Sequence, residues 1–152
     1  MDHVHGHLIN RVTVGQGAPL AMIHCALASH ETLLPLAGQI DGRIGLMDMP
    51  GHGRSDDWDG RANYHDLLCD ALTGSCAPGT HVIGHSLGAT VALRLAIERP
   101  ELVGRLTLIE PVYFAAAKGT EAHQQHVDRF RPFIKAMQAD DCLLYTSDAA
   151  DE

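Results

Sequence analysis

Short apolar runs alternate with segments of helical spacing along most of the chain. The apolar runs predict strands at 8–14, 20–25, 43–49, 81–83 and 106–109. Apolar positions three and four residues apart predict helices at 63–72, 87–99 and 121–138. The helix over 87–99 is apolar nearly all round, which is typical of a buried helix, and Pro132 is expected to interrupt the last one. Strands that alternate with helices predict an α/β fold, with a mostly parallel sheet and helices on both faces.

The composition and the charge narrow the function classes. Hydrophobic residues make up 45% and charged residues 20% of the 152 positions, which is enough apolar surface for a packed core. Nineteen acidic against eleven basic residues give a net charge of -8, the wrong sign for a general nucleic-acid binder. We therefore expect no nucleic-acid partner. The oligomeric state is not indicated by the sequence.

The apolar runs and the cysteines bear on location and on cofactors. No apolar run reaches the roughly 18 residues that a membrane span needs, and residues 1–7 lack the pattern of a signal peptide. The four cysteines form no Cys-x-x-Cys pair, so neither a zinc ribbon nor a disulfide scaffold is indicated. His3, His5 and His7 alternate as weak metal ligands on one strand face do, but a frayed polar terminus is the preferred interpretation. We expect a cytoplasmic protein with no cofactor, no metal and no membrane span.

The last eleven residues, 142–152, resemble an in-frame translation of a transposase-type sequencing adapter. They read Cys-Leu-Leu-Tyr-Thr-Ser-Asp-Ala-Ala-Asp-Glu. Segments of this origin are left out of reasoning about the fold. The tail holds three acids and no base, so residues 1–141 carry sixteen acids and eleven bases, a net charge of -5. The alternative is a genuine short acidic tail.

One motif carries most of the chemical information, Gly84-His85-Ser86-Leu87-Gly88. It follows a predicted strand and opens a predicted helix, which is the context that a G-x-S-x-G nucleophile elbow requires. The turn is so tight that small residues must flank the serine, and the helix that follows directs N–H groups toward the reacting centre. The alternative is an ordinary serine N-cap between a strand and a helix.

Three further motifs accompany the elbow in chain order. They are His24-Cys25-Ala26-Leu27, Asp48-Met49-Pro50-Gly51-His52-Gly53-Arg54-Ser55 and Ile109-Glu110-Pro111. With the elbow, these motifs make residues 8–111 resemble the α/β-hydrolase superfamily, serine hydrolase branch. The resemblance implies an N-terminal part of the hydrolase core at 1–111, the start of a helical cap or lid at 112–141, and a non-native tail at 142–152. The whole fold is then truncated before its last strands.

The resemblance also implies roles for individual residues. Ser86 is the nucleophile, and a serine rather than an aspartate at the elbow implies attack on ester-like or other acyl bonds of a small-molecule substrate. Backbone N–H groups of Leu87 and Ala26 form the oxyanion hole. Cys25 stands where the family usually has glycine, which makes the assignment of Ala26 less secure than that of Leu87.

The rest of a catalytic triad is not visible. The fold places the acid and then the histidine after the serine, and the only later histidines are His123 and His126, in the expected cap. Glu110 is a possible acid, because some branches carry it at the end of the strand after the nucleophile helix. We find no catalytic histidine in this chain and expect the fragment to be inactive. The alternatives are a non-catalytic ligand-binding or interaction protein on the same fold, and a haloperoxidase-like or acyltransferase activity.

Overall fold

The computed structural model of the chain describes residues 2–138. The chain divides into two compact units, with the boundary between residues 112 and 113. The expected division into a hydrolase core at 1–111 and the start of a cap at 112–141 stays a prediction. The predicted tail at 142–152 lies outside the described residues.

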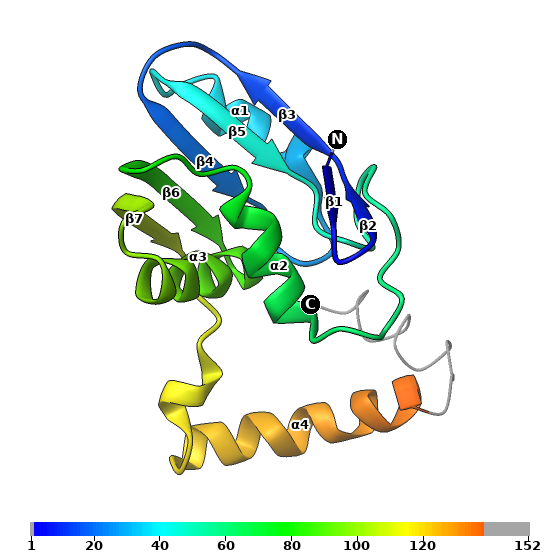
Figure 1. Cartoon of the computed structure of the whole chain (residues 1–152). Helices are drawn as coiled ribbons and strands as arrows, with labels where there is room; N and C mark the ends of the chain where they lie inside the picture. Colours follow the sequence, from blue (N-terminus) through cyan, green and yellow to red (C-terminus); the bar gives the residue numbers. More distant parts are fainter. Residues whose placement is uncertain (1, 139–152) are drawn as a thin grey trace. The chain divides into compact units, whose positions relative to one another are not determined.

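A five-stranded sheet forms the centre of the first unit. Its strands lie in the order β3-β5-β4-β6-β7 (Figure 1). Their bounds are β3 Arg11–Val14, β5 Arg43–Met47, β4 Pro19–Ile23, β6 Thr80–His85 and β7 Val103–Ile109. All neighbours are parallel except β3, which runs antiparallel to β5. The predicted α/β class with a mostly parallel sheet is confirmed.

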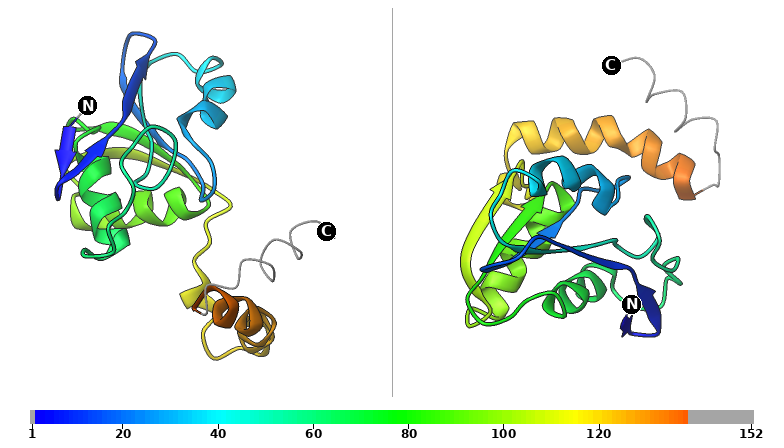
Figure 2. Two further views of the ribbon diagram at one scale, coloured as in Figure 1. Left: turned by 90° about the vertical axis from the view of Figure 1, so that its right-hand side faces the viewer. Right: turned by 90° about the horizontal axis from the view of Figure 1, so that it is seen from above.

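Helices cover both faces of this sheet. The 3₁₀ helix η1 (His30–Leu33) and α1 (Leu34–Ala37) lie on one face, and α2 (Tyr64–Thr73) and α3 (Leu87–Glu98) lie on the other (Figures 1 and 2). Side chains of β4 alternate between the two cores: Leu20 and Met22 pack toward α1, while Ala21 and Ile23 pack toward α2 and α3. A strand apolar at every position, as β4 is, therefore suits a sheet buried on both faces.

The N-terminal region differs from its prediction. The expected strand over 8–14 is two strands, β2 (His7–Ile9) and β3, separated at Asn10. β2 pairs antiparallel with β1 (Asp2–Val4), so these residues form a hairpin rather than a frayed terminus. The chain divides at Asn10 because the amide and backbone of Asn10 bind Asp48 and Ser55, far along the sequence.

Two predicted helices also need correction. The helix α3 is not buried all round as its apolar sequence predicts, since Ile97 is 72% exposed. In the second unit, η2 (Phe114–Ala117) precedes α4 (Glu121–Gln138), which continues through Pro132 without the expected interruption.

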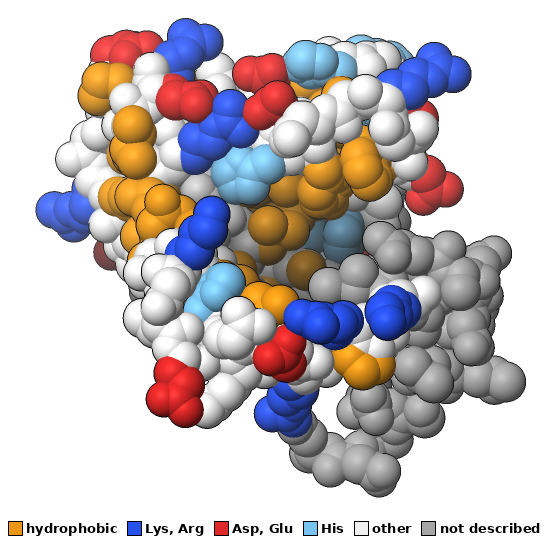
Figure 3. All heavy atoms as spheres, turned by 90° about the horizontal axis from the view of Figure 1, so that it is seen from below, with side chains coloured by type: hydrophobic (Ala, Val, Ile, Leu, Met, Phe, Trp, Pro, Cys, Tyr) orange, Lys and Arg blue, Asp and Glu red, His pale blue; other side chains and the backbone are white. Residues whose placement is uncertain are grey.

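None of the helices described over residues 2–138 is long and apolar enough to cross a membrane. On the face in Figure 3, basic and acidic side chains are interspersed rather than gathered into one basic patch.

The strand order places a topological switch point at the carboxyl ends of β4 and β6. The chain leaves β4 toward β5 on one side and later returns to β6 on the other side of β4. Loops that follow β4 and β6 therefore diverge at their carboxyl ends, which is where ligands bind in open α/β sheets. Residues 24–29 and the elbow begin at this point.

Candidate active site

Ser86 occupies a strained turn between β6 and α3. Its backbone has φ 54° and ψ −114°, a region that non-glycine residues rarely adopt. It stands at the N-cap position of α3, yet its side chain makes no capping hydrogen bond. The Ser86 N–H instead donates to the Ile109 carbonyl at 2.9 Å, which ties the turn to the end of β7. An ordinary serine N-cap does not describe this geometry.

The glycines on either side of Ser86 are required by close approach of the backbone. A Cβ added at Gly84 would lie 2.4 Å from the Gly88 carbonyl oxygen and 2.6 Å from the Cα of Ala89. A Cβ added at Gly88 would lie 2.5 Å from the His24 carbonyl oxygen. The strand, the turn and the helix can pack this tightly only without side chains at these two positions.

The same contacts bring the loop after β4 beside the elbow. Ile23 and Gly84 are register partners in adjacent parallel strands, and Gly88 approaches the backbone of residues 23 and 24. The N–H groups of Leu87 and Ala26 donate to no other group within residues 2–138. Cys25 does not have a positive φ, so a side chain at this position is compatible with the loop.

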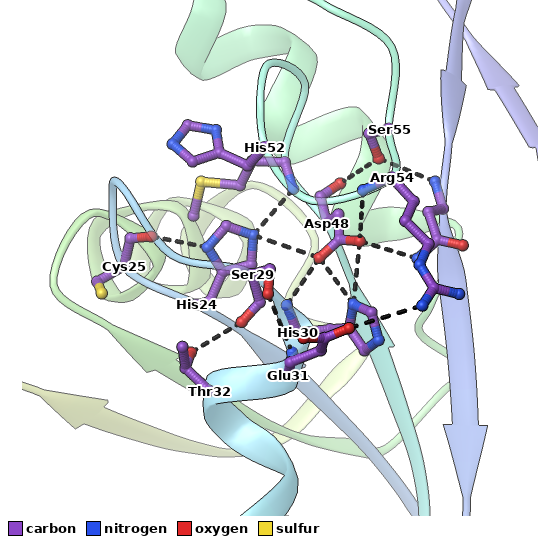
Figure 4. A network of polar contacts seen from close by, with 12 residues as sticks. His24, Cys25, Ser29, His30, Glu31, Thr32, Asp48, His52, Arg54 and Ser55 are labelled. Carbon is purple, nitrogen blue, oxygen red and sulfur yellow. Dashed lines mark hydrogen bonds and ion pairs between the residues drawn. The ribbon is translucent and has the colours of Figure 1, made fainter.

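Asp48 organises the loop that follows β5. Its carboxylate is fully buried and accepts from the N–H of His30 at 2.7 Å, the N–H of Arg54 at 3.1 Å and the amide of Asn10 at 2.8 Å. The Nδ1 of His30 lies 2.9 Å from the same carboxylate (Figure 4). Burial alone would raise the pKa of Asp48, but these hydrogen bonds outweigh it and the pKa is lowered.

The glycine at position 53 follows from this network. A Cβ added there would lie 2.3 Å from the Asp48 carboxyl carbon, and the residue has φ +56°. The hydroxyl of Ser55 donates to the Asp48 carbonyl at 2.8 Å. The loop is therefore folded around the Asp48 carboxylate. Gly53 leaves room for that carboxylate, and Ser55 adds a hydrogen bond to the Asp48 backbone.

A buried histidine joins this loop to the loop after β4. The Nδ1–H of His24 donates to the Cys25 carbonyl at 2.7 Å, and its Nε2 accepts the Met49 N–H at 3.0 Å. Both bonds are satisfied by the neutral ring with its proton on Nδ1. Burial is the main cause that lowers the pKa of His24 from its ordinary value of 6.5, which favours this neutral form.

The remaining site residues are less closely engaged. Glu110, the candidate acid, is 85% exposed on its side chain and has φ 46°. Its carboxylate lies 3.7 Å from the Nε2 of His85. In the second unit, His126 of α4 stacks between Phe114 and Phe130, with ring centroids 4.6 Å and 4.4 Å apart.

Two partners of Asp48 were not anticipated from the sequence. Asn10 and His30 lie 38 and 18 residues from it, and no local pattern links them.

The histidines near the N-terminus have other partners, since His5 lies 2.7 Å from Asp70 and His7 lies 3.4 Å from Asp59. Over the part of the chain that the structure describes, no three His, Cys, Asp or Glu side chains are placed to hold a metal ion.

Comparisons with known proteins agree with this architecture. The chain belongs to the alpha/beta hydrolase family, whose model matches residues 20–149. It is 28% identical over 123 residues to (E)-2-((N-methylformamido)methylene)succinate hydrolase of Acinetobacter baylyi, covering 77% of this chain and 46% of that protein. It is 35% identical over 104 residues to a pimeloyl-[acyl-carrier protein] methyl ester esterase of Nitrosomonas europaea, covering 64% of this chain and 38% of that protein.

Solved structures give the same fold. An epoxide hydrolase of Bacillus megaterium superposes with a TM-score of 0.75 at 19% identity, covering 92% of this chain and 53% of the other. An alpha/beta hydrolase fold protein of Burkholderia ambifaria has a TM-score of 0.60 at 25% identity and covers 80% of this chain and 53% of the other. The chain thus spans about half the length of its structural neighbours, and less than half of these two curated relatives.

Proposed function

We propose that Ser86 is the nucleophile of a serine hydrolase that cleaves ester-like or other acyl bonds. The observation that carries this proposal is the backbone of Ser86, held at φ 54° and ψ −114° while its hydroxyl is not used as a helix cap. Residues in such conformations cluster at functional sites, where the surrounding packing maintains the strain. Here the surrounding packing is the close approach of the backbone at Gly84 and Gly88.

In the proposed reaction the Ser86 hydroxyl attacks the acyl carbon and passes its proton to a histidine. The bond between the acyl carbon and the leaving group breaks, the leaving group departs with that proton, and an acyl-enzyme remains. Water then attacks the acyl-enzyme, which releases the acid and regenerates the Ser86 hydroxyl. The N–H groups of Leu87 and Ala26 donate to the oxyanion that develops during attack, and each such donor is worth about 10²–10³ in rate. Support for this assignment is that both N–H groups lack a hydrogen-bond partner among residues 2–138, and that Gly88 of the elbow approaches the backbone at His24, two residues before Ala26.

We propose that the catalytic histidine and further strands lie beyond residue 141, and that this chain alone is inactive. The edge strand supports this view. No residue of β7 is fully buried, whereas four of the five residues of β4 are buried. Parallel strands are normally covered on both faces and paired on both sides. Glu110, which directly follows β7, is the candidate for the acid of the triad.

The names of relatives support the substrate class. One is named a methyl ester esterase and another a hydrolase of a substituted succinate. Both names describe hydrolysis of a small or carrier-bound acyl compound. A hydrolase acting on a small ester-like substrate is therefore the function that we propose for the complete protein.

The test uses the longer gene product, in which native sequence continues past residue 141 in place of the 142–152 tail. It compares hydrolysis of p-nitrophenyl acetate and butyrate by this protein and by its Ser86→Ala variant. We expect kcat to fall by about 10⁴-fold or more, because loss of the nucleophile removes the covalent route. Ser75→Ala, in the segment after α2 and outside both the elbow and the loops that follow β4 and β5, is the matched control and should retain activity. The 152-residue chain should show no turnover above its own Ser86→Ala variant. Undiminished hydrolysis by Ser86→Ala in the longer protein contradicts the proposal.

A further inference from the structure

The loop after β4 and the loop after β5 are joined by two reciprocal hydrogen bonds, each from a backbone N–H of one loop to a histidine of the other. The Met49 N–H donates to the Nε2 of His24 at 3.0 Å. In the opposite direction, the Leu27 N–H donates to the Nε2 of His52 at 3.0 Å. Each loop therefore supplies one histidine and one backbone donor to the other. The rings of His24 and His52 lie 5.5 Å apart between centroids.

The hydrogen bonds determine which nitrogen of each ring carries the proton. The Nδ1 of His52 lies 3.1 Å from the Pro50 carbonyl, as the Nδ1 of His24 lies 2.7 Å from the Cys25 carbonyl. A carbonyl oxygen only accepts, so both rings donate from Nδ1 and accept at Nε2. The hydroxyl of Tyr64 also donates to the Pro50 carbonyl, at 2.8 Å, and reinforces this side of His52.

These bonds fix the two peptide groups that flank Ala26. The Cys25 carbonyl and the Ala26 N–H belong to one planar trans peptide, so they point in opposite directions. His24, by binding that carbonyl, sets the direction of the Ala26 N–H. The Leu27 N–H belongs to the next peptide, and His52 holds that one. The two histidines thus hold Ala26 from both sides.

Leu27 depends on its bond to His52. It has φ 60°, a conformation that non-glycine residues rarely adopt, and it is 97% exposed, so side-chain packing does not stabilise it. Its N–H bond to His52 is the polar contact that holds it in this conformation.

We infer that His52 is a positioning residue of the oxyanion hole, acting through Leu27 to hold the Ala26 N–H toward the reacting centre while His24 holds the other side. This inference rests on the proposed function. It concerns a residue that does not touch substrate, and its structural consequence can be measured without any catalysis.

The test uses amide hydrogen exchange of the 152-residue chain, resolved by residue with NMR. In His52→Ala the Leu27 amide should exchange about fivefold faster or more, as expected for loss of one net hydrogen bond. His52→Gln should restore protection, because the Gln side chain places an acceptor oxygen near the position of Nε2. His52→Asn is the matched control: it places polar atoms near Nδ1 instead and should leave Leu27 unprotected.

Core amides such as those of Leu46 and Val82 report whether each variant is folded. If His52→Ala exposes the core as well, the comparison of Gln with Asn decides the matter. Equal exchange at Leu27 in the wild type and in His52→Asn, or failure of Gln to protect it, overturns the inference. In the longer gene product, His52→Asn should lower kcat with little change in KM, and His52→Gln should recover it. Failure of Ser86→Ala to abolish hydrolysis would refute the proposed function but leave the exchange result standing.

Discussion

The loop network around Asp48 and the elbow around Ser86 both follow the carboxyl ends of strands in one sheet. They differ in whether their polar groups have hydrogen-bond partners within the protein. Asp48 is fully buried, and its carboxylate accepts hydrogen bonds from the side-chain amide of Asn10 and from the backbone N–H groups of His30 and Arg54. Ser86 makes no side-chain cap, and Glu110 is 85% exposed with one ion-pair contact. Polar groups that bind each other add stability, whereas groups left without partners are available to a ligand.

These differences separate a framework from the proposed reactive centre. The framework consists of residues 24–30 and 48–55, whose glycine and histidines are fixed by contacts within the protein. The reactive centre consists of residues 84–88 and Glu110, where the backbone is strained and the side chains have few contacts. Loss of the buried contacts of Asp48 should therefore mainly affect stability, and loss of a side chain in the proposed reactive centre should mainly affect chemistry. His52 is the framework residue that is inferred to affect catalysis as well, through Leu27.

The largest effect is expected from Asp48→Ala. It leaves the amide of Asn10 and the N–H groups of His30 and Arg54 without their acceptor, and each buried donor left unsatisfied costs about 1–3 kcal/mol. Urea unfolding of the 152-residue chain measures this change in the free energy of unfolding. Glu110→Ala is the matched acid at the same edge and should change stability by about 0.5 kcal/mol or less. Similar losses for both variants would remove the distinction between the two regions.

A smaller effect is expected from pH. Burial lowers the pKa of His24 below 6.5 in the folded protein, so below that pH the unfolded chain binds more protons than the folded one. Stability is therefore present above about pH 6.5 and falls as the pH decreases through the lowered pKa, by at most about 1.4 kcal/mol per pH unit for this group. His65 and His81, whose pKa values burial also lowers, add to the same trend.

His24→Gln isolates the part of this trend that belongs to the framework. Glutamine retains an acceptor oxygen near the Nε2 position but does not titrate. The decline of unfolding free energy between about pH 7 and about pH 5 should be shallower in this variant than in the wild type. An unchanged slope would show that His24 is not held neutral by the network.

A third prediction concerns strain at the elbow. Ser86→Gly should be more stable than Ser86→Ala by about 1 kcal/mol, because glycine adopts φ 54° without the steric cost that alanine retains. Thermal or urea unfolding of the two variants measures the difference. If glycine is the less stable of the two, the backbone at Ser86 is not strained.

The smallest change in stability is expected from Glu110→Gln. The side chain is exposed, so unfolding of the 152-residue chain should shift by about 0.5 kcal/mol or less. If Glu110 is the acid of the triad, the same substitution in the longer gene product should lower kcat. Full activity of that variant would assign the acid to another carboxylate, beyond residue 141.

The sequence predicted the elements that depend on local pattern, and it predicted less of what depends on distant contacts. The order of strands and helices and the elbow context follow from apolar periodicity and from Gly84 and Gly88. The break at Asn10 does not, because its cause is Asp48, 38 residues away. The continuity of α4 through Pro132 was also missed, since proline alone indicated an interruption.

The same limit applies to the site. The sequence predicts the loop motif from Asp48 to Ser55. That the Asp48 carboxylate accepts hydrogen bonds from His30 and Asn10 is visible only in the folded structure. His52 occupies a variable position within that motif, and only its distance to Leu27 singles it out. The identity of the acid and of the histidine stays a prediction, as do the roles of Leu87 and Ala26.

The central claim is that Ser86 is the nucleophile. A fluorophosphonate probe, which reacts with activated serines, should be incubated with the gene product that extends past residue 141, and the modified peptide should be identified by mass spectrometry. The account predicts one adduct on Ser86, lost in Ser86→Ala, with Ser29, Ser55 and Ser75 unmodified. An active protein that carries its adduct on another residue, or hydrolyses esters without modification of Ser86, would contradict it.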